Sequence, residues 1–202
     1  MPTKILIVFY SRNGTMETFA NAVAEGARAE GAEVRLRRAR EVVSRDVMAK
    51  APGWVENADR MNAEYEAPTS EDAEWADAII FGTPSRFGAV CAELKAFIDS
   101  LVGLWAQGTL NDKPASVFSA SSVLHGGNEA TILSLYPPLS HLGMIIVPLG
   151  YTDPSLYKAG SPYGATAATG RGDERRLPND PEKAVAIHQG RRVTRIAAKL
   201  AG

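Results

Sequence analysis

A short polar loop, residues 11–16, directly follows an apolar segment and could bind a phosphate. It offers the hydroxyls of Ser11 and Thr15 just before a stretch with helical spacing. The unpaired N–H groups and the positive dipole end at such a helix N-terminus stabilise an anion. Because neither a lysine nor a Walker-type glycine pattern is present, the loop favours a phosphomonoester over a magnesium nucleotide. An ordinary helix cap would use the same residue types.

Two further loops carry polar or glycine residues after apolar segments. In residues 83–88 the rigid Pro84 stands beside Arg86 and Phe87. A planar ligand could rest against the Phe87 ring, although an ordinary core phenylalanine and a solvated arginine also fit this pattern. The third loop, residues 120–128, contains two adjacent glycines. In an open parallel sheet the ligand lies beyond the carboxyl ends of the strands, so we expect the three loops to line one site.

Several single residues could also do chemistry. His141 could donate a proton, since an unperturbed imidazole titrates near neutral pH, but a core or interface histidine would fit the same turn. His125 is either a ligand contact or a solvated loop residue, and His188 is predicted to be a surface residue of the last helix. Cys91 is interpreted as a packing residue. A basic cluster late in the chain could meet a cofactor phosphate or stay solvated: Arg171, Arg175 and Arg176.

Composition narrows the class of protein. The chain has 202 residues, 45% of them hydrophobic, and a formal charge of -1. This balance is that of a folded globular protein rather than a disordered one, and near-neutrality argues against bulk binding of nucleic acid. One cysteine can form neither an internal disulfide nor a zinc cluster. We expect a cytoplasmic protein with no membrane span and no metal site, since no apolar run approaches the length of a membrane helix.

The order of apolar segments predicts an α/β fold. Continuous apolar runs at 5–10, 78–81, 115–119 and 144–147, together with an alternating run at 33–38, are typical of strands. Helical spacing follows each loop, and the expected helices cover residues 17–29, 71–75, 92–102, 129–142 and 180–200. Pro137 and Pro138 are expected to end or kink the fourth of these. The pattern predicts a sandwich with a mostly parallel sheet.

With these loops in place, the sequence resembles the flavodoxin-like NAD(P)H:quinone oxidoreductases of the WrbA type. The resemblance runs essentially from end to end. Its most specific part is the combination of Thr-Pro-Ser-Arg-Phe-Gly at 83–88 with Pro-Tyr-Gly-Ala-Thr at 162–166. Further matching stretches are Val8–Ser11 with Gly14, Gly103–Trp105, His125–Glu129 and His141–Pro148. The resemblance implies one domain over residues 1–202, a three-layer sandwich whose five-stranded parallel sheet has the order 2-1-3-4-5, with excursions at 39–70 and 150–179.

The resemblance also implies an FMN-binding, cytoplasmic quinone reductase that assembles as a homotetramer and takes electrons from NADH or NADPH. The phosphate-loop pattern of the family falls on Ser11, Arg12, Asn13, Gly14, Thr15 and Met16. Its second flavin loop falls on Ser85, Arg86 and Phe87. Its third falls on Ala120, Ser121, Ser122, Val123, Leu124, His125 and Gly126. The active-site histidine, which also contacts the flavin, falls on His141, and the tryptophan that flanks the quinone falls on Trp105.

Two positions depart from the family pattern. Asn13 stands where some relatives have an aromatic residue thought to touch the nicotinamide cofactor. The third loop carries Val123, Leu124 and His125 where relatives are richer in glycine, so we expect the flavin edge to be held differently, with His125 as an extra contact.

The expected reaction is a ping-pong hydride transfer in which NAD(P)H leaves before the quinone binds in the same place. Trp105 and Phe87 would form apolar walls for the quinone, and His141 would donate a proton to its reduced oxygen. Three alternatives stay open. They are a flavodoxin-type electron carrier, for which the chain is less acidic than expected, a non-enzymatic interaction module, and a flavin reductase that releases reduced FMN.

Overall fold

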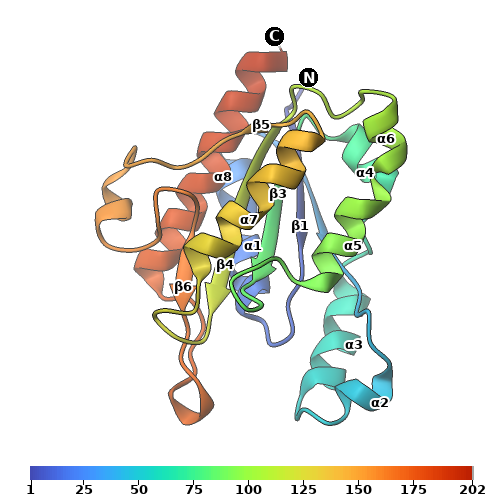
Figure 1. The fold of residues 1–202 in the computed structure, drawn as a ribbon. Helices are drawn as coiled ribbons and strands as arrows, with labels where there is room; N and C mark the ends of the chain where they lie inside the picture. Colours follow the sequence, from blue (N-terminus) through green and yellow to red (C-terminus); the bar gives the residue numbers. More distant parts are fainter. Residues whose placement is uncertain (202) are drawn as a thin grey trace.

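The computed structural model describes the backbone of residues 1–201 and the side chains of residues 1–200. Its parallel sheet contains β1 (Lys4–Phe9), β2 (Glu33–Arg38), β3 (Ala78–Pro84), β4 (Pro114–Ser121) and β5 (Ile145–Ile146) in the order β2-β1-β3-β4-β5 (Figure 1). The expected strand order 2-1-3-4-5 is therefore confirmed. The central strands are buried on both faces, as their unbroken apolar sequences predict.

A sixth strand corrects the expectation of one long loop at 150–179. β6 (Thr166–Ala168) pairs in parallel with the last residues of β4, whereas β5 pairs with its first two residues. Two short 3₁₀ turns, η1 (Pro154–Tyr157) and η2 (Gly172–Glu174), lie in the same stretch. Because β6 runs parallel to β4, the residues that follow it emerge at the carboxyl ends of the strands. The late part of the chain therefore reaches the edge where we expect the ligand.

Helices cover both faces of the sheet (Figure 1). On one face, α1 (Thr15–Ala29) and α8 (Asp180–Ala201) enclose a core with β-strand residues such as Ile7 and Phe118. The backbones of these two helices touch, because a Cβ atom on Gly26 would lie 2.0 Å from the carbonyl oxygen of Ile187. Only glycine permits that approach. The other face is covered by α4 (Ser70–Trp75), α5 (Ala92–Ser100), α6 (Val102–Ala106) and α7 (Asn128–His141).

The expected excursion at 39–70 holds two helices beside the sheet, α2 (Arg45–Met48) and α3 (Trp54–Glu64). They have a small apolar core of their own, made by Met48, Trp54 and Ala58. Figure 1 shows α2 and α3 at the lower end of the molecule, the end toward which the parallel strands run. This position puts them next to the loop that follows β1.

Two sequence expectations about helices were wrong in detail. α7 runs through Pro137 and Pro138 to His141, so of the two expected effects, ending or kinking the helix, the prolines do not end it. The segment expected as one helix over 92–102 stops at Ser100 and is followed by α6. Each proline removes one N–H donor and costs stability, and the packing of Ile132, Leu135 and Leu139 against the sheet offsets that cost. No helix within the described residues has the length and apolar character needed to cross a membrane.

Candidate FMN site

The three loops expected at the ligand site line one cavity of about 630 Å³, a size typical of small-molecule sites. The predicted residues that line it are Ser11, Arg12, Asn13, Thr15, Met16, Ser85, Arg86, Phe87, Ala120, Ser121, Ser122, Val123 and Gly126. Residues after β6 complete the wall: Thr169, Gly170, Arg171, Gly172 and Arg175. Of these, the sequence had indicated only Arg171 and Arg175 as possible contacts of a cofactor phosphate. The sheet brings these segments together because all of them leave its carboxyl edge.

The loop after β1 presents unpaired N–H groups to the cavity. Gly14 has a φ of 86°, a left-handed conformation that favours glycine, and its N–H donates to the Ser11 hydroxyl at 3.0 Å. The N–H groups of Arg12, Asn13, Thr15 and Met16 find no acceptor among the described residues. A phosphate is the type of group that such a set of donors binds at a helix N-terminus. The loop therefore fits the phosphate of FMN.

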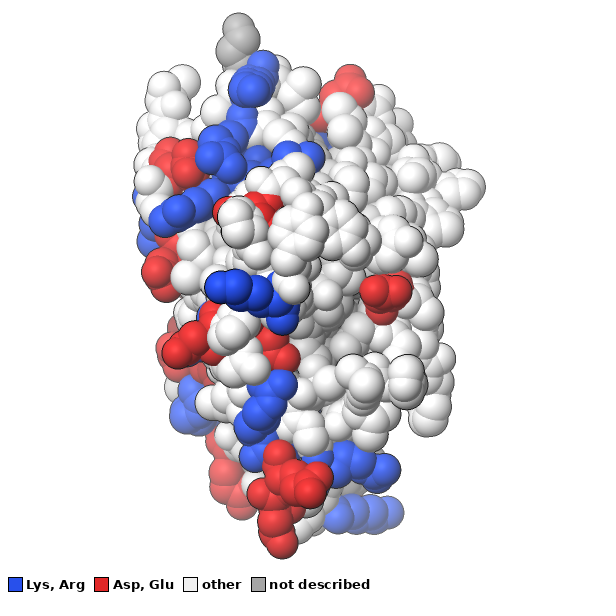
Figure 2. All heavy atoms as spheres, turned by 90° about the vertical axis from the view of Figure 1, so that its left-hand side faces the viewer, with Lys and Arg blue, Asp and Glu red and all other residues white. Residues whose placement is uncertain are grey.

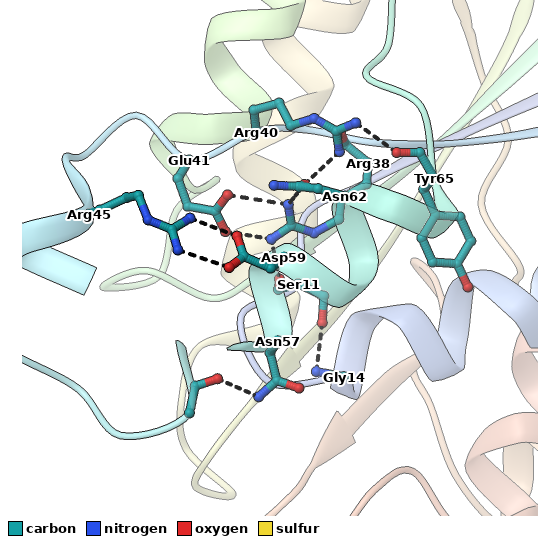
Figure 3. Close-up of polar contacts among 11 residues, drawn as sticks. Ser11, Gly14, Arg38, Arg40, Glu41, Arg45, Asn57, Asp59, Asn62 and Tyr65 are labelled. Atoms are coloured by element: carbon teal, nitrogen blue, oxygen red, sulfur yellow. Dashed lines mark hydrogen bonds and ion pairs between the residues drawn. The ribbon is translucent and has the colours of Figure 1, made fainter. Parts of the chain in front are cut away.

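A buried arginine supports this loop from behind (Figure 3). Arg38, the last residue of β2, is fully buried, and its Nη2 donates to the Ser11 carbonyl oxygen at 3.0 Å. Its guanidinium also pairs with Glu41 and donates to the Asn62 side chain. Figure 3 shows these groups converging on Arg38 from α3 and from the segment after β2. The segment at 39–70 thus neutralises the charge of Arg38 and holds its guanidinium against the loop at 11–16.

The excursion contacts the same loop a second time. The Arg12 guanidinium lies 3.3 Å from the centroid of the Trp54 ring, a cation–π contact with the first residue of α3. Burial lowers the pKa of Arg12 below its ordinary value, and the nearby charge of Arg86 acts in the same direction. Sequence reasoning missed Arg38 and Trp54. The run of arginines at 35, 37, 38 and 40 at the end of a predicted strand was the available signal, because an arginine that is fully buried there needs a charged partner.

The second and third loops are tied to one another. The Ser85 hydroxyl donates to the Gly126 carbonyl oxygen at 2.6 Å and accepts from the Thr131 hydroxyl at 2.9 Å. Between them Phe87 is fully exposed and has a φ of 55°, which is uncommon for a bulky residue. The reading of Phe87 as an ordinary core residue is therefore wrong. A strained, solvent-facing ring at the mouth of a cavity is typical of a binding position.

Comparison with known proteins identifies the family. The family model described as NADPH-dependent FMN reductase matches residues 3–153. The chain belongs to this family. A protein from Deinococcus radiodurans named NAD(P)H dehydrogenase (quinone) is 43% identical over 202 residues, which cover 100% of this chain and 98% of that protein. Both findings confirm the expected class, an NAD(P)H-dependent oxidoreductase that uses FMN.

Solved structures agree with the fold of this chain. A WrbA-like flavodoxin from Agrobacterium tumefaciens superimposes with a TM-score of 0.66 at 24% identity, covering 98% of each chain. A flavodoxin from the domain Archaea gives a TM-score of 0.61 at 15% identity, covering 97% of this chain and 99% of the other. At these identities the likeness concerns the fold, and it confirms the flavodoxin-like architecture.

Two residues that the sequence predicted as catalytic do not line the cavity. His141 and Trp105 line a second hollow of about 420 Å³ with Ile98, Asp99, Val102, Pro138 and Leu142. α7 starts beside the first cavity and spends 14 residues, about 20 Å, running to His141. Figure 1 shows α6 and the end of α7 at the upper end of the molecule, opposite the phosphate loop. Within one chain, His141 and Trp105 therefore lie together but away from the three loops that line the first cavity.

Other predicted positions also lie elsewhere. Leu124 and His125 line a third hollow, of about 810 Å³, on the far side of the third loop. His188 is buried rather than at the surface, and its Nε2 lies 2.9 Å from the Thr152 hydroxyl. Burial lowers the pKa of His188. Cys91 is buried as expected, its N–H donates to the Thr83 hydroxyl, and burial raises the pKa of its thiol to about 11, so it is a packing residue.

Proposed function

We propose that this FMN reductase family member reduces quinones to hydroquinones with two electrons taken from NADH or NADPH. The observation that carries the proposal is the cavity at the carboxyl edge, where the unpaired N–H groups of the loop at 11–16 face an open mouth beside Phe87. The full-length similarity to a protein named NAD(P)H dehydrogenase (quinone) supports the choice of quinone as acceptor. When bound, FMN would accept a hydride from the donor and pass two electrons to the acceptor.

The residues of the chain have separate tasks in this proposal. The N–H groups of Asn13 and Thr15, with the Thr15 hydroxyl, hold the phosphate, and Arg38 keeps their loop in place. The loops at 85–87 and 120–126 enclose the flavin ring, and their mutual hydrogen bond at Ser85 fixes the width of the slot. Phe87 shields one side of the mouth, where donor and quinone would bind in turn in a ping-pong cycle.

A second copy of the chain would bring His141 and Trp105 to the flavin. Since His141 lies about 20 Å along α7 from the third loop and Trp105, on α6, lines the same hollow as His141, these two residues would act in the reaction on the flavin of a neighbouring subunit. The exposed side chains of Val102, Trp105 and Leu133 support assembly through this face. α7 carries one carboxylate, Glu129, and few charged side chains lie on the right-hand side of Figure 2. We therefore propose the homotetramer that the resemblance implies, in the cytoplasm.

An absorbance titration with FMN, followed by turnover of benzoquinone, tests the function. We expect yellow protein that is reduced rapidly by a nicotinamide donor and reoxidised by the quinone. A flavodoxin-type carrier would bind FMN but would not be reduced rapidly by NADH or NADPH. The family description favours one further candidate, a reductase that releases reduced FMN. It would lose its flavin during turnover, which gel filtration of the reacting protein would detect.

A further inference from the structure

Glu17 places a negative charge beside the loop at 11–16. It is the third residue of α1, and its Oε2 would lie 3.6 Å from a Cβ atom on Gly14. In a capping box, a glutamate at this position turns back to accept from the N–H group of the residue before the helix. That donor is already used, because the Gly14 N–H donates to the Ser11 hydroxyl. A free Glu17 carboxylate would therefore be attracted to the other N–H groups of the loop, which are the donors proposed for the phosphate of FMN.

Arg60 of α3 engages both oxygens of this carboxylate. Its Nη1 donates to Glu17 Oε1 at 2.8 Å and its Nη2 donates to Glu17 Oε2 at 2.6 Å, which is the two-pronged geometry that makes arginine–carboxylate pairs strong. The Glu17 side chain is 13% exposed, so water screens its charge only in part. Among the described residues, no backbone N–H group donates to the Glu17 side chain. The carboxylate is thus bound to α3 and not to the N–H groups at the start of its own helix.

α3 contacts two more charged residues around the same loop. Asn62 accepts from the Arg38 guanidinium behind the loop (Figure 3), and the Trp54 ring stacks on the Arg12 guanidinium at the cavity. The three contacts of α3 reach three different elements, namely the loop after β1, the first turn of α1 and the last residue of β2. One helix of the excursion therefore positions two arginines and neutralises one carboxylate at the proposed phosphate site.

We propose that α3 raises the affinity of the chain for the phosphate of FMN, and that Arg60 does so as a positioning residue by neutralising Glu17. The proposal rests on the FMN site of the proposed function and not on the choice of quinone. A phosphate monoester carries a charge of about -1.5 to -2 near neutral pH, so an unpaired carboxylate beside it would repel it. While Arg60 binds it, Glu17 neither adds a net charge nor competes for the N–H donors of the loop. Riboflavin lacks the phosphate, so its binding should not depend on this pair.

Titration of the flavin-free protein with FMN and with riboflavin separates a charge effect from a structural one. At low salt, where screening is weak, we expect Arg60→Ala to weaken FMN binding at least about fivefold and riboflavin binding less than about twofold. Glu17→Gln/Arg60→Ala also removes the carboxylate charge, and it should bind FMN within about twofold of the wild type. The matched control is Arg45→Ala, which breaks an exposed pair of the same two-pronged kind with Asp59 of α3 and should leave both affinities unchanged.

The salt dependence of FMN binding is the second readout. The difference in FMN affinity between the wild type and Arg60→Ala should shrink toward about 1 M salt, where the Debye length is only about 3 Å. Equal losses of FMN and riboflavin affinity in Arg60→Ala would overturn the proposal, because α3 would then support the cavity only as a scaffold. Weak FMN binding that persists in the double variant would overturn it as well, since the Glu17 charge would not be the cause. If the wild type bound neither flavin, the proposed function itself would fail, which differs from a protein that binds FMN equally well with and without Arg60.

Discussion

Arg38 Nη2 donates to the Ser11 carbonyl oxygen at 3.0 Å, which joins the end of β2 to the loop after β1. The contact places a fully buried guanidinium directly behind the proposed phosphate site. Its partner Glu41 is nearly as buried, so the pair is shielded from water. Buried pairs of this kind contribute little net stability, but removing one partner leaves the other charge uncompensated.

Replacing this arginine should therefore affect both stability and FMN binding. We expect Arg38→Met to lower the free energy of unfolding by about 3 kcal/mol, because the Glu41 carboxylate loses its buried partner. The double variant Arg38→Met/Glu41→Gln should recover much of that loss while FMN binding stays weak, since the contact with Ser11 is still absent. Urea denaturation and FMN fluorescence titration measure the two effects. Arg45→Ala is the control, because it breaks only the exposed pair with Asp59 and should change neither quantity. Full FMN affinity in the double variant would contradict the positioning role.

The hydroxyl of Thr15 offers a narrower test of the phosphate site. It lines the cavity at the first residue of α1. We expect Thr15→Ala to weaken FMN binding by roughly 1–2 kcal/mol through the loss of one hydrogen bond to a charged acceptor. Thr15→Ser keeps the hydroxyl and should bind FMN nearly as the wild type does. If alanine and serine variants bound FMN equally well in a titration, the hydroxyl would have no part in holding the phosphate.

Replacing His141 tests whether the second hollow, which His141 lines, takes part in the reaction at the first cavity. We expect His141→Ala to reduce quinone turnover at least about tenfold, the lower range for loss of an acid catalyst, and to reduce FMN affinity less. His125→Ala, in the third loop, serves as the comparison because its side chain lines a different hollow. Stopped-flow reoxidation by benzoquinone and FMN titration give the two numbers.

The proposed role of His141 depends on the assembly of several copies of the chain. Light scattering of the wild type should give a mass above that of one chain, as in the proposed homotetramer, because His141 lies far from the loops that line the first cavity of its own chain. A monomeric protein whose quinone turnover nevertheless depends on His141 would contradict the subunit arrangement. Equal losses of turnover and FMN affinity would instead indicate a structural role for the histidine.

Burial of Cys91 predicts a pH dependence of stability. Burial raises the pKa of the thiol to about 11 in the folded protein, against an ordinary value of 9.0. Between these values the unfolded chain has lost the proton that the folded chain keeps. Stability that is fully present below pH 9 is therefore lost as the pH rises toward 11, by roughly 1.4 kcal/mol per pH unit within that window.

Urea denaturation at pH 8 and pH 10 measures the effect, with Cys91→Ala as the reference that isolates the thiol from the tyrosines. The wild type should lose more stability than the variant between the two pH values. Iodoacetamide at pH 8 should label the native protein slowly and the urea-unfolded protein rapidly. Rapid labelling of the native protein would show that the thiol is accessible and would remove the basis for the pH effect.

The sequence by itself determined the sheet and three walls of the cavity. Runs such as 5–10 and 78–81 have enough apolar residues to be buried on both faces, and parallel strands send their loops to one edge. Local composition therefore predicted that residues 11–16, 83–88 and 120–128 meet. The motifs in these loops also indicated the family correctly.

Only the tertiary structure decided the remaining features, because they depend on pairing between distant segments. β6 pairs with the far end of β4, and this brings Arg171 to the cavity from a stretch that reads as a loop. The burial of Arg38 required Glu41 and Asn62 to converge on it, which no local pattern encodes. The separation of His141 from the flavin loops follows from the length of α7 and its direction across the sheet. A residue's type shows what chemistry it can do, but its distance from a cofactor is set by the packing of whole elements.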